Sequence, residues 1–402
     1  MIRKDSKEGI GYSVVDLDGV RHVFAAAVPG NGGDLAEQAR DALGTIERLT
    51  REEGTRGSIV HQAVFLKDIG HRDACRRIMR EFYGDELPAT TYIPQAPCGG
   101  KLLEIEALGV GRQTDDVRIE RFSEQLVIVR HGGLAWAHLA DIRPSPSTCG
   151  VYDRSLEVFR QAGRDLEAHG FSYQQMVRTW LYLGEIVGPE GDTERYRELN
   201  RARSTFYSGL RFGDSRLPAG SARPVYPAST GIGTAGRDVI LSGIAVASDR
   251  KDLALVPLEN PLQTSAFDYS VRYGPKSPKF SRAMAVVAGD FACLFISGTA
   301  SITASETRHA GDMEGQTWQT LNNLAALISE ENLCRHGLPG FGATLDDLAL
   351  VRVYVKRQED FQTAREVCSV RLGELPSVAA IADVCREDLL VEIEGLAFSR
   401  RS

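Results

Sequence analysis

The chain has 402 residues, which is more than one hydrophobic core usually holds, so two or three domains are expected. The formal net charge of −7 argues against a general nucleic-acid-binding protein, because such proteins need a basic surface that displaces counterions from phosphates. No run of sequence approaches the roughly 18 to 20 apolar residues of a transmembrane helix, and residues 1–6 lack the apolar core of a signal peptide. We therefore expect a cytoplasmic protein without a nucleic-acid or membrane partner.

Seven cysteines are spread along the chain without any C-x-x-C spacing. An odd number of cysteines without paired spacing argues against both a disulfide framework and a zinc site. We expect reduced cysteines and no bound metal ion.

Three segments of the chain resemble one another. They are Leu-Leu-Glu-Ile-Glu-Ala-Leu-Gly-Val at 102–110, Val-Ile-Leu-Ser-Gly-Ile-Ala-Val at 239–246 and Leu-Val-Glu-Ile-Glu-Gly-Leu-Ala-Phe at 390–398. Their separation of about 140 to 150 residues is that of a repeated small domain. With boundaries near 117 and 258, the chain divides into units 1–117, 118–258 and 259–402.

The same order of elements is predicted upstream of each of these segments, from apolar residues at helical or alternating spacing. The expected helices span 35–53, 71–82, 153–169, 193–208, 315–330 and 360–372, and the strands between paired helices span 58–66, 176–183 and 348–356. A hairpin is expected at 291–301 in the third unit. Each unit therefore reads as β-β-α-β-α-β-β, an α+β sheet with two helices on one face.

The last strand, predicted over 384–398, carries two carboxylates on an otherwise apolar face. Side chains alternate along a strand, so Glu392 and Glu394 point the same way as Leu390 and Leu396. Desolvation and like-charge repulsion both raise a carboxyl pKa, so one of the two glutamates can stay protonated near neutrality and act as an acid. The alternative is a solvated edge strand on which both glutamates face water.

The second helix of the second unit has an unusual face. Tyr196, Asn200, Arg203 and Tyr207 recur at i, i+4, i+7 and i+11, where an ordinary amphipathic helix shows leucine or valine. Aromatic, amide and guanidinium groups together suit a polar ring that carries carboxylates. The alternative is a solvated helix face that includes two tyrosines.

The third unit adds further candidate binding residues. Arg365 occupies the matching position on helix 360–372, and Arg272 lies in a segment, 267–282, that is rich in proline and cations. The strand end at 297–301, Ser-Gly-Thr-Ala-Ser, is built of small residues, which let a ligand approach the backbone closely.

The order of elements, with Val-Phe-Leu-Lys-Asp at 64–68, Pro-Ala-Thr at 88–90 and Leu-Glu-Ile-Glu at 103–106, resembles the RidA (YjgF) superfamily over nearly the whole chain. Members of that superfamily and of the similar chorismate mutase-like fold form trimers with ligand sites between sheets. The resemblance therefore implies three RidA-like units that form an intramolecular pseudo-trimer, in a protein that is a monomer or a dimer.

The resemblance does not extend to imine deaminase chemistry. RidA deaminases carry an arginine directly after Pro-Ala, where it binds the substrate carboxylate. This chain has Thr90, Ser229 and Ser377 or Val378 at the corresponding places, and none can form the bidentate guanidinium–carboxylate pair. The first unit resembles a degenerate copy whose role is packing.

Residues 118–402 are similar to the chorismatases, the two-unit branch of the superfamily. The segments that carry the similarity are 177–184, 196–207, 227–233, 297–301, 308–312 and 384–394. The similarity implies that chorismate is cleaved with release of pyruvate, without metal or cofactor. The N-terminal unit departs from the family pattern and leaves room for a changed substrate.

The same similarity implies roles for individual residues. Glu392 matches the family glutamate seven residues after a cysteine, here Cys385, and would protonate the enol methylene, although strand alternation alone leaves Glu394 open. The candidate carboxylate clamps are the three arginines, with Tyr207 and Asn200 as hydrogen-bonding partners. These arginines are Arg203, Arg272 and Arg365.

Two residues bear on the product. Ala300 resembles the chorismatases that hydrolyse chorismate to a dihydroxycyclohexadiene carboxylate, whereas Cys385 resembles those that form 3-hydroxybenzoate. We favour 3-hydroxybenzoate. The alternatives are an enzyme that acts on a related enol ether or aromatic acid, and a RidA-like protein that binds a small molecule without turnover.

Overall fold

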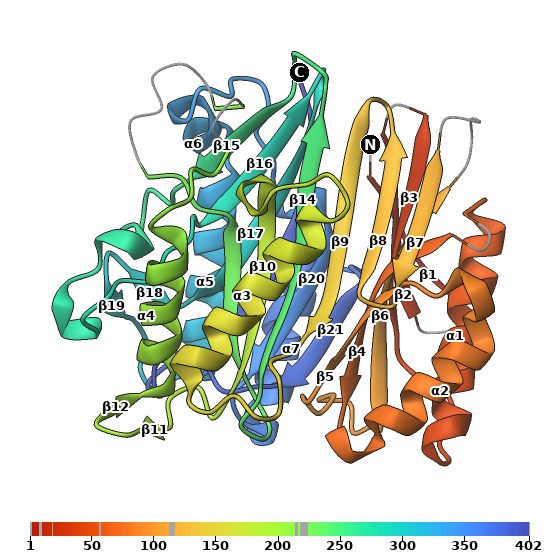
Figure 1. The fold of residues 1–402 in the computed structure, drawn as a ribbon, viewed down its shortest axis with the longest axis horizontal. Coiled ribbons are helices and arrows are strands. Elements are labelled where there is room, and N and C mark those ends of the chain that lie inside the picture. The colour runs from red at the N-terminus through yellow and green to blue at the C-terminus, as the bar shows by residue number, and fades with distance from the viewer. Residues whose placement is uncertain are drawn as a thin grey trace.

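The structure is a computed structural model that describes residues 2–7, 10–17, 19–55, 58–111, 117–213, 216–217 and 224–401. Three six-stranded sheets follow one another along the chain, each with helices on one face (Figure 1). The first unit contains β1 (Ile2–Lys7), β2 (Ile10–Leu17), β3 (Val20–Ala27), α1 (Leu35–Glu52), β4 (Ile59–Leu66), α2 (Arg72–Tyr83), β5 (Ala89–Ile93) and β6 (Leu103–Gly111).

The second unit follows the same plan and adds a small hairpin before its second helix. It contains β7 (Arg118–Ser123), β8 (Leu126–His131), β9 (Leu134–Ile142), α3 (Val151–Glu167), β10 (Met176–Gly184), β11 (Pro189–Glu190), β12 (Thr193–Glu194), α4 (Arg195–Tyr207), β13 (Ala228–Thr234) and β14 (Val239–Ser248).

The third unit carries its own small hairpin and one additional short helix. It contains β15 (Ala254–Leu258), β16 (Ala283–Ala288), β17 (Phe291–Ala300), β18 (Ile302–Thr303), β19 (Glu306–Thr307), α5 (Met313–Ile328), α6 (Glu330–Arg335), β20 (Leu348–Val355), α7 (Phe361–Leu372), β21 (Ser377–Ile381) and β22 (Val391–Arg400).

All three sheets have one topology. Their orders are β1-β2-β3-β6-β4-β5, β7-β8-β9-β14-β10-β13 and β15-β16-β17-β22-β20-β21. In each sheet the last strand of the unit lies in the centre, antiparallel to both neighbours, and the strand after the second helix forms a parallel edge. A residue on β6, β14 or β22 therefore has a counterpart in the other two units.

The predicted α+β class and the repeat are confirmed, with one more strand in each six-stranded sheet than expected. Three strands of that sheet, not two, precede the first helix of each unit. The hairpin predicted at 291–301 is wrong, because this segment is the single strand β17, which pairs with the preceding β16. β15 also belongs to the third sheet, so that sheet begins at Ala254, ahead of residue 258. We propose that each unit consists of one six-stranded sheet with its helices, so that the third unit begins with β15.

The last strand begins later than predicted. β22 starts at Val391, whereas residues 384–390 form a loop that turns at Arg386 through the backbone bond from Leu389 N to Arg386 O, 3.3 Å. Glu387 and Asp388 are exposed in this turn. Two adjacent exposed carboxylates cannot continue a central strand that is covered on both faces.

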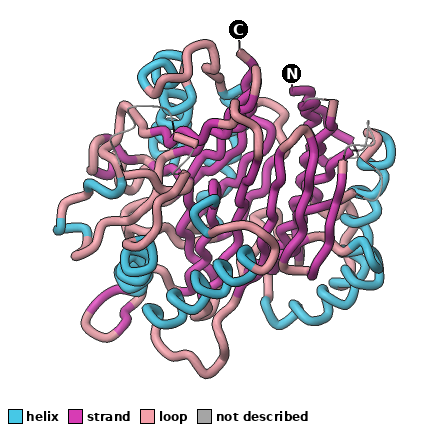
Figure 2. The backbone as a smooth tube through the Cα atoms, turned by 45° about the horizontal axis from the view of Figure 1, so that its top comes forward, coloured by secondary structure: helices cyan, strands magenta, loops and turns pink. Residues whose placement is uncertain are grey.

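The three sheets face one another around a shared core. Side chains from every sheet contribute to it, and they include Phe24, Trp180, Ile244, Phe295 and Phe398. The helices lie outside, and the strands gather in the interior of the molecule (Figure 2). Burying the inner faces of three sheets against one another produces the covalent pseudo-trimer.

The first helix illustrates how local sequence sets these elements. Asp34 caps α1 in a capping box, in which its side chain accepts from Glu37 N and the Glu37 side chain accepts from the Asp34 backbone. Apolar residues then recur at helical spacing, and Leu43, Ile46 and Leu49 are fully buried against the outer face of the first sheet.

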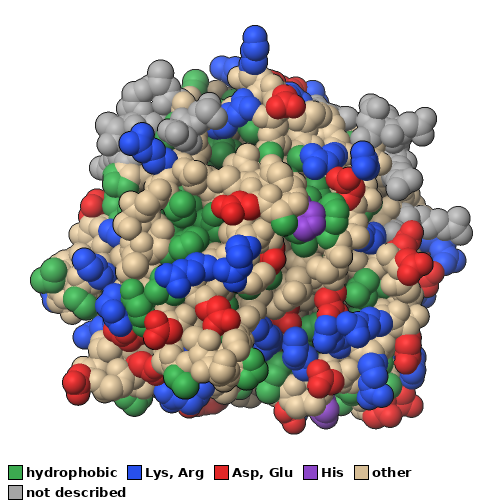
Figure 3. All heavy atoms as spheres, in the orientation of Figure 1, with side chains coloured by type: hydrophobic (Ala, Val, Ile, Leu, Met, Phe, Trp, Pro, Cys, Tyr) green, Lys and Arg blue, Asp and Glu red, His purple; other side chains and the backbone are tan. Residues whose placement is uncertain are grey.

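Figure 3 shows basic and acidic side chains side by side over much of one face of the molecule. Among the described residues, no helix is long and apolar enough to cross a membrane. The seven cysteines are free, and Cys75, Cys98 and Cys293 are buried.

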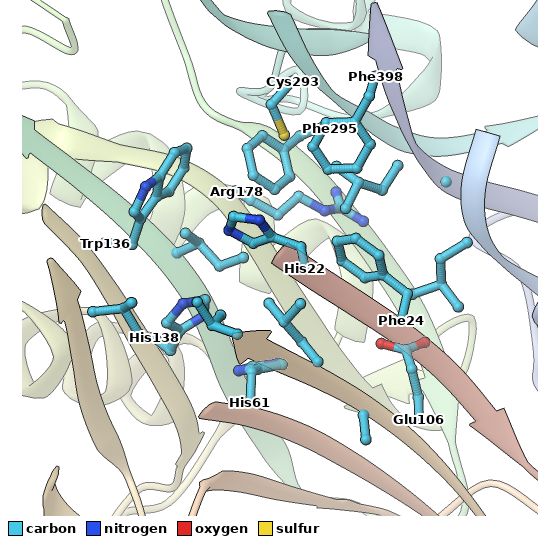
Figure 4. A pocket seen from close by; sticks show the side chains of 18 of the residues that line it. His22, Phe24, His61, Glu106, Trp136, His138, Arg178, Cys293, Phe295 and Phe398 are labelled. Atoms are coloured by element: carbon cyan, nitrogen blue, oxygen red, sulfur yellow. The ribbon is translucent and has the colours of Figure 1, made fainter. Parts of the chain in front are cut away.

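A cavity of about 100 Å³ lies between the three sheets (Figure 4). It is lined largely by apolar side chains, together with four histidines: His22, His61, His131 and His138. Burial lowers the pKa of His22 to about 3 and that of His138 to about 4, so both imidazoles are neutral. We regard this cavity as part of the packing between sheets.

Beside the cavity, a buried charge network joins the units. Arg352 of β20 binds Glu106 of β6 in a bidentate pair at 2.6 and 2.7 Å and lies 3.2 Å from Glu394 of β22. Arg178 of β10 binds Glu394 at 2.7 Å. Each unit thus contributes at least one member, and all four side chains are nearly inaccessible to water.

We predict that Arg352→Met destabilises the protein by about 3 to 5 kcal/mol, because Glu106 would lose its buried counter-charge and Glu394 would keep only Arg178. Chemical denaturation at pH 7 measures the effect. The control is Arg371→Met, an exposed arginine on α7, which should change stability by no more than about 0.5 kcal/mol. Equal stabilities of the two variants would contradict the role of the network.

Candidate active site

A pocket of about 410 Å³ lies between the second and third units. The second unit contributes the inner face of α4 and the edge strand β13. The third unit contributes β17, β22, the segment 269–282 and the loop before β22. The wall includes Tyr196, Asn200, Ser229, Gly231, Phe280, Arg282, Gly298, Ala300, Cys385, Arg386 and Glu392.

Glu392 is the buried carboxyl group of this pocket. On β22 it pairs with Ala300 of β17 on one side and with Tyr354 of β20 on the other. The residue is only 5% exposed, and within the described part of the chain no group donates a hydrogen bond to its carboxyl. The side chain passes so close over Gly298 that a Cβ there would collide with its Oε1, so any larger residue at this position would displace the Glu392 carboxyl.

The environment keeps Glu392 protonated. Burial, reinforced by the negative charge of Glu394, raises the pKa of Glu392 to about 8, and the positive charges of Arg178 and Arg282 offset only part of this rise. A carboxylic acid with this pKa is neutral at pH 7. It can donate its proton into the pocket.

Glu394 has the opposite state. Burial by itself would raise its pKa, but Arg178 and Arg352 outweigh burial, and the pKa of Glu394 lies below its ordinary value. Trp180 also donates a hydrogen bond to its Oε1 at 2.7 Å. Glu394 lines the central cavity, away from the pocket that contains Glu392. The geometry therefore favours Glu392 over Glu394 as the acid, the alternative that strand alternation had left open.

The pocket brings together five of the predicted residues. Asn200, Ala300, Cys385 and Glu392 line its wall, and Arg272 lies at its rim. Burial, with the nearby Glu392 carboxyl, raises the pKa of the Cys385 thiol to about 12, so this thiol stays protonated.

The predicted clamp arginines are placed differently from expectation. Arg272 is 58% exposed in its side chain and pairs with Glu306. Arg203 is buried one layer behind the wall, where it donates to Asn200 and lies 3.5 Å from the Ser229 hydroxyl. It supports wall residues and does not itself line the pocket.

Two further predictions are wrong in their placement. Tyr207 is buried in an aromatic cluster with Tyr173, Phe212 and Tyr226, away from the pocket wall. Arg365 lies in another pocket, between the third and first units. The reason is the arrangement of the units, in which some residues of the second helix share a pocket with the next unit. Asn200 of α4 lies in the pocket that contains Glu392, and Arg365 of α7 lies in the pocket that contains Glu104.

Sequence reasoning missed two cations of the wall, Arg282 and Arg386. Arg282 is 3% exposed, donates to the Tyr269 hydroxyl at 2.6 Å, and its Nε has no hydrogen-bond partner among the described residues. Arg386 lies over the ring of Tyr273 at 4.3 Å. Two features of the sequence could have indicated them: Arg282 directly precedes the apolar strand β16, and Arg386 directly follows Cys385.

The pocket thus combines a neutral acid with fixed cations. Guanidinium groups such as those of Arg282 and Arg386 can bind anionic groups, and a neutral carboxyl such as that of Glu392 can donate a proton. Within the ranges that the structure describes, no group of three histidine, cysteine, aspartate or glutamate side chains is arranged to hold a metal ion.

Comparisons with known proteins agree on one family. A family model described as "Chorismatase FkbO/Hyg5-like, N-terminal" matches residues 117–245. A chorismatase from Streptomyces rapamycinicus is 36% identical over 284 residues, which cover 66% of this chain and 77% of the relative. A 3-hydroxybenzoate synthase from Streptomyces hygroscopicus is 35% identical over 232 residues, which cover 56% of this chain and 64% of that protein.

The fold comparison includes the N-terminal unit. A crystal structure of a chorismatase, 25% identical, superposes with a TM-score of 0.65 and covers 85% of this chain and 93% of that chain. Residues 118–402 make up less than 85% of the chain, so the superposition extends into the N-terminal unit. The expectation that this unit departs from the family pattern is therefore wrong for the part that superposes. A RutC family protein from Pyrococcus horikoshii is 33% identical over 119 residues, 29% of this chain and 85% of the relative, which supports the superfamily resemblance.

We predict that Glu392→Gln stabilises the protein increasingly as pH rises from about 4.5 to 8. The folded wild type binds this proton more tightly than the unfolded chain, so wild-type stability falls across that window. The variant, which cannot ionise, should gain about 1 to 3 kcal/mol relative to wild type between the two limits. Urea denaturation at each pH measures it. The exposed control Glu81→Gln should show no such trend, and a pH-independent difference for Glu392→Gln would contradict the buried neutral acid.

Proposed function

The chain belongs to the chorismatase family, and we propose that it cleaves the enolpyruvyl ether of chorismate, with Glu392 as the proton donor. The observation that carries this proposal is a buried acid that is neutral at pH 7 and faces a pocket with fixed cations. An enol ether is inert until its methylene carbon is protonated, so the reaction needs an acid of this kind.

In the first step the alkene electrons of the enol ether form a C–H bond with the Glu392 proton. The adjacent carbon becomes an oxocarbenium ion, and Glu392 becomes a carboxylate. The positive charges of Arg178 and Arg282 stabilise the carboxylate as it forms. If water captures the oxocarbenium, it returns a proton to Glu392, and the resulting hemiketal breaks its bond to the ring oxygen and passes its hydroxyl proton to that oxygen, which gives pyruvate and the diene diol. If the neighbouring ring hydroxyl captures it, that proton returns to Glu392 and a cyclic ketal forms. Loss of a ring C–H proton with cleavage of one ring C–O bond then makes the ring aromatic, and the remaining hemiketal breaks its bond to the ring oxygen, which gives pyruvate and 3-hydroxybenzoate.

The substrate carries two carboxylates, which Arg282 and Arg386 bind in place of the clamps expected from the sequence. Arg282 is held by its bonds to Tyr269 and to the Thr264 carbonyl, 3.0 Å, so its guanidinium is positioned before the substrate arrives. Arg203 positions the Asn200 and Ser229 side chains on the opposite wall.

The proposed second product is 3-hydroxybenzoate. Ala300 lies opposite Glu392 across the β17–β22 ladder, and Cys385 lies close enough for the Glu392 charge to act on its thiol. Both subtype residues therefore lie where the oxocarbenium is captured. The similarity to a 3-hydroxybenzoate synthase supports capture by the ring hydroxyl.

We predict that Glu392→Gln lowers pyruvate release from chorismate by at least about 1,000-fold, because the amide cannot protonate carbon. A lactate dehydrogenase-coupled assay measures pyruvate, and circular dichroism checks the fold. Glu81→Gln, an exposed carboxylate of α2 outside the pocket wall, should keep turnover within about threefold. Turnover near that of wild type in Glu392→Gln would remove Glu392 from the mechanism.

The pH dependence follows from the same group. Turnover number should be constant below pH 8 and fall about tenfold per pH unit above it, because the protonated fraction of Glu392 decreases as pH rises through its pKa of about 8. Steady-state kinetics at saturating chorismate between pH 6 and 10 test this expectation. Turnover that rises through this range would show that the reaction uses a base in place of the acid.

Chromatography of a chorismate digest tests the product. We expect 3-hydroxybenzoate and pyruvate in equal amounts, together with little of the diene diol. A digest that contains the dihydroxycyclohexadiene carboxylate as its main ring product would refute capture by the ring hydroxyl and would leave the Glu392 proton transfer intact.

A further inference from the structure

A second pocket, of about 270 Å³, lies between the third and first units. It is enclosed by α7, β20 and β21 of the third unit, and by β6 with the loop before it from the first unit. The wall includes Val28, Pro97, Lys101, Glu104, Val351, Val353, Phe361, Arg365, Cys368, Leu372, Leu375 and Ser377.

This pocket repeats the active site at equivalent positions. Glu104 pairs with Phe65 of the adjacent strand as Glu392 pairs with Tyr354, and each lies two residues before the glutamate that binds Arg352. The loop before each acidic strand has the same length. The equivalent wall pairs, active pocket first, are Tyr196 and Phe361, Asn200 and Arg365, Ser229 and Ser377, and Cys385 and Pro97.

Glu104 is an acid without a partner. It is 4% exposed, and no hydrogen bond or ion pair to its carboxyl occurs within the described part of the chain. Burial, together with the charge of Glu106, raises the pKa of Glu104 to about 8. The group is therefore neutral at pH 7 and presents an O–H donor to the pocket.

Two cations on the wall also lack an anionic partner among the described residues. Among the described residues, Lys101 donates hydrogen bonds only to the backbone oxygens of Gly30 and Asn31, at 3.5 and 3.3 Å. Arg365 is exposed on α7 and has no ion pair in the same part of the chain. An interface built only for packing would be expected to pair Glu104 with one of them. Both instead share the wall of the pocket with a neutral acid.

The rest of the wall is largely apolar. Valines from β20, Phe361 and two leucines form a surface that suits a compact hydrocarbon ring. We propose that this pocket binds a small cyclic or aromatic monocarboxylate, whose carboxylate contacts Lys101 and Arg365 and accepts a hydrogen bond from Glu104. The first unit then contributes a binding site to the protein in addition to its packing.

Ionisation of Glu104 sets the pH range of binding, because its carboxylate would repel the ligand. The groups that face Glu104 are Glu106 on its own strand, Cys98 and Lys101 on the preceding loop, and Arg365 and Cys368 on α7. Glu106 remains paired with Arg352. Affinity should therefore fall as pH rises above 8.

Fluorine NMR titration of the full chain with 4-fluorobenzoate tests the proposal. Wild type should bind it at this pocket, Arg365→Met should weaken that binding at least about tenfold, and Arg371→Met, on the same helix, should not. Arg386→Met identifies any additional binding in the active pocket. Binding that is lost in Arg386→Met and unchanged in Arg365→Met would place the probe in the active pocket alone and overturn the proposal.

A second arm uses Glu104→Gln, which keeps a hydrogen-bond donor and removes the ionisation. Wild-type affinity at the Arg365-dependent site should fall about fivefold between pH 8 and 9, because the protonated fraction of Glu104 falls by that factor, whereas Glu104→Gln should bind equally at both. Equal pH dependence in the two proteins would also overturn the proposal. Because binding is measured directly, either result is distinguishable from a failure of chorismate cleavage, which the pyruvate assay reports.

Discussion

Two arginines hold two glutamates where the three sheets meet, out of reach of water. Arg352 binds both Glu106 and Glu394, and Arg178 completes the network on the side of the second unit. Charges so deeply buried persist only when each has a partner, so the relative positions of the units are constrained by this contact. The same network keeps Glu394 ionised, and that negative charge helps to hold the neighbouring Glu392 in its neutral form.

The spacing of residues along β22 places Glu392 and Glu394 in different surroundings. Residues two apart on β22 share a face, and the interval of about 7 Å separates the charge network from the pocket. Glu394 enters the network and Glu392 enters the pocket. A register shift in β17 between Ile296 and Thr299 places Gly298 under the Glu392 carboxyl, where no side chain competes for the space.

Equivalent positions in the three units carry different side chains. The position of Glu392 on β22, at the interface of the second and third units, corresponds to Glu104 on β6, at the interface of the third and first units, and to Ile240 on β14. The helix that covers each interface carries its own polar residues, Asn200 in one case and Arg365 in another. Three repeats with one topology therefore diverged through the side chains at their contacts.

Much of the fold could be predicted because the repeat, the helices and the central strands leave periodic patterns in the sequence. The first strands were harder. β15 is separated from β16 by the long segment 259–282, and only its pairing with β16 assigns it to the third sheet. The sequence pattern also predicts too early a start for β22, because apolar residues before Val391 continue the strand pattern. In the structure the chain forms a loop there, with Glu387 and Asp388 exposed.

The sequence by itself determined the chemical candidates: a pair of glutamates two residues apart, a polar helix face, and the resemblance to chorismatases. Only the tertiary structure decided which glutamate is neutral, because a pKa depends on the charges that other strands bring near. It also decided which arginines meet the acid. Arg365 and Glu392 belong to one unit but to different interfaces, whereas Asn200 of another unit lines the same pocket as Glu392. The packing of three sheets around one core decides which residues of different units lie close together, and local sequence patterns do not contain this information.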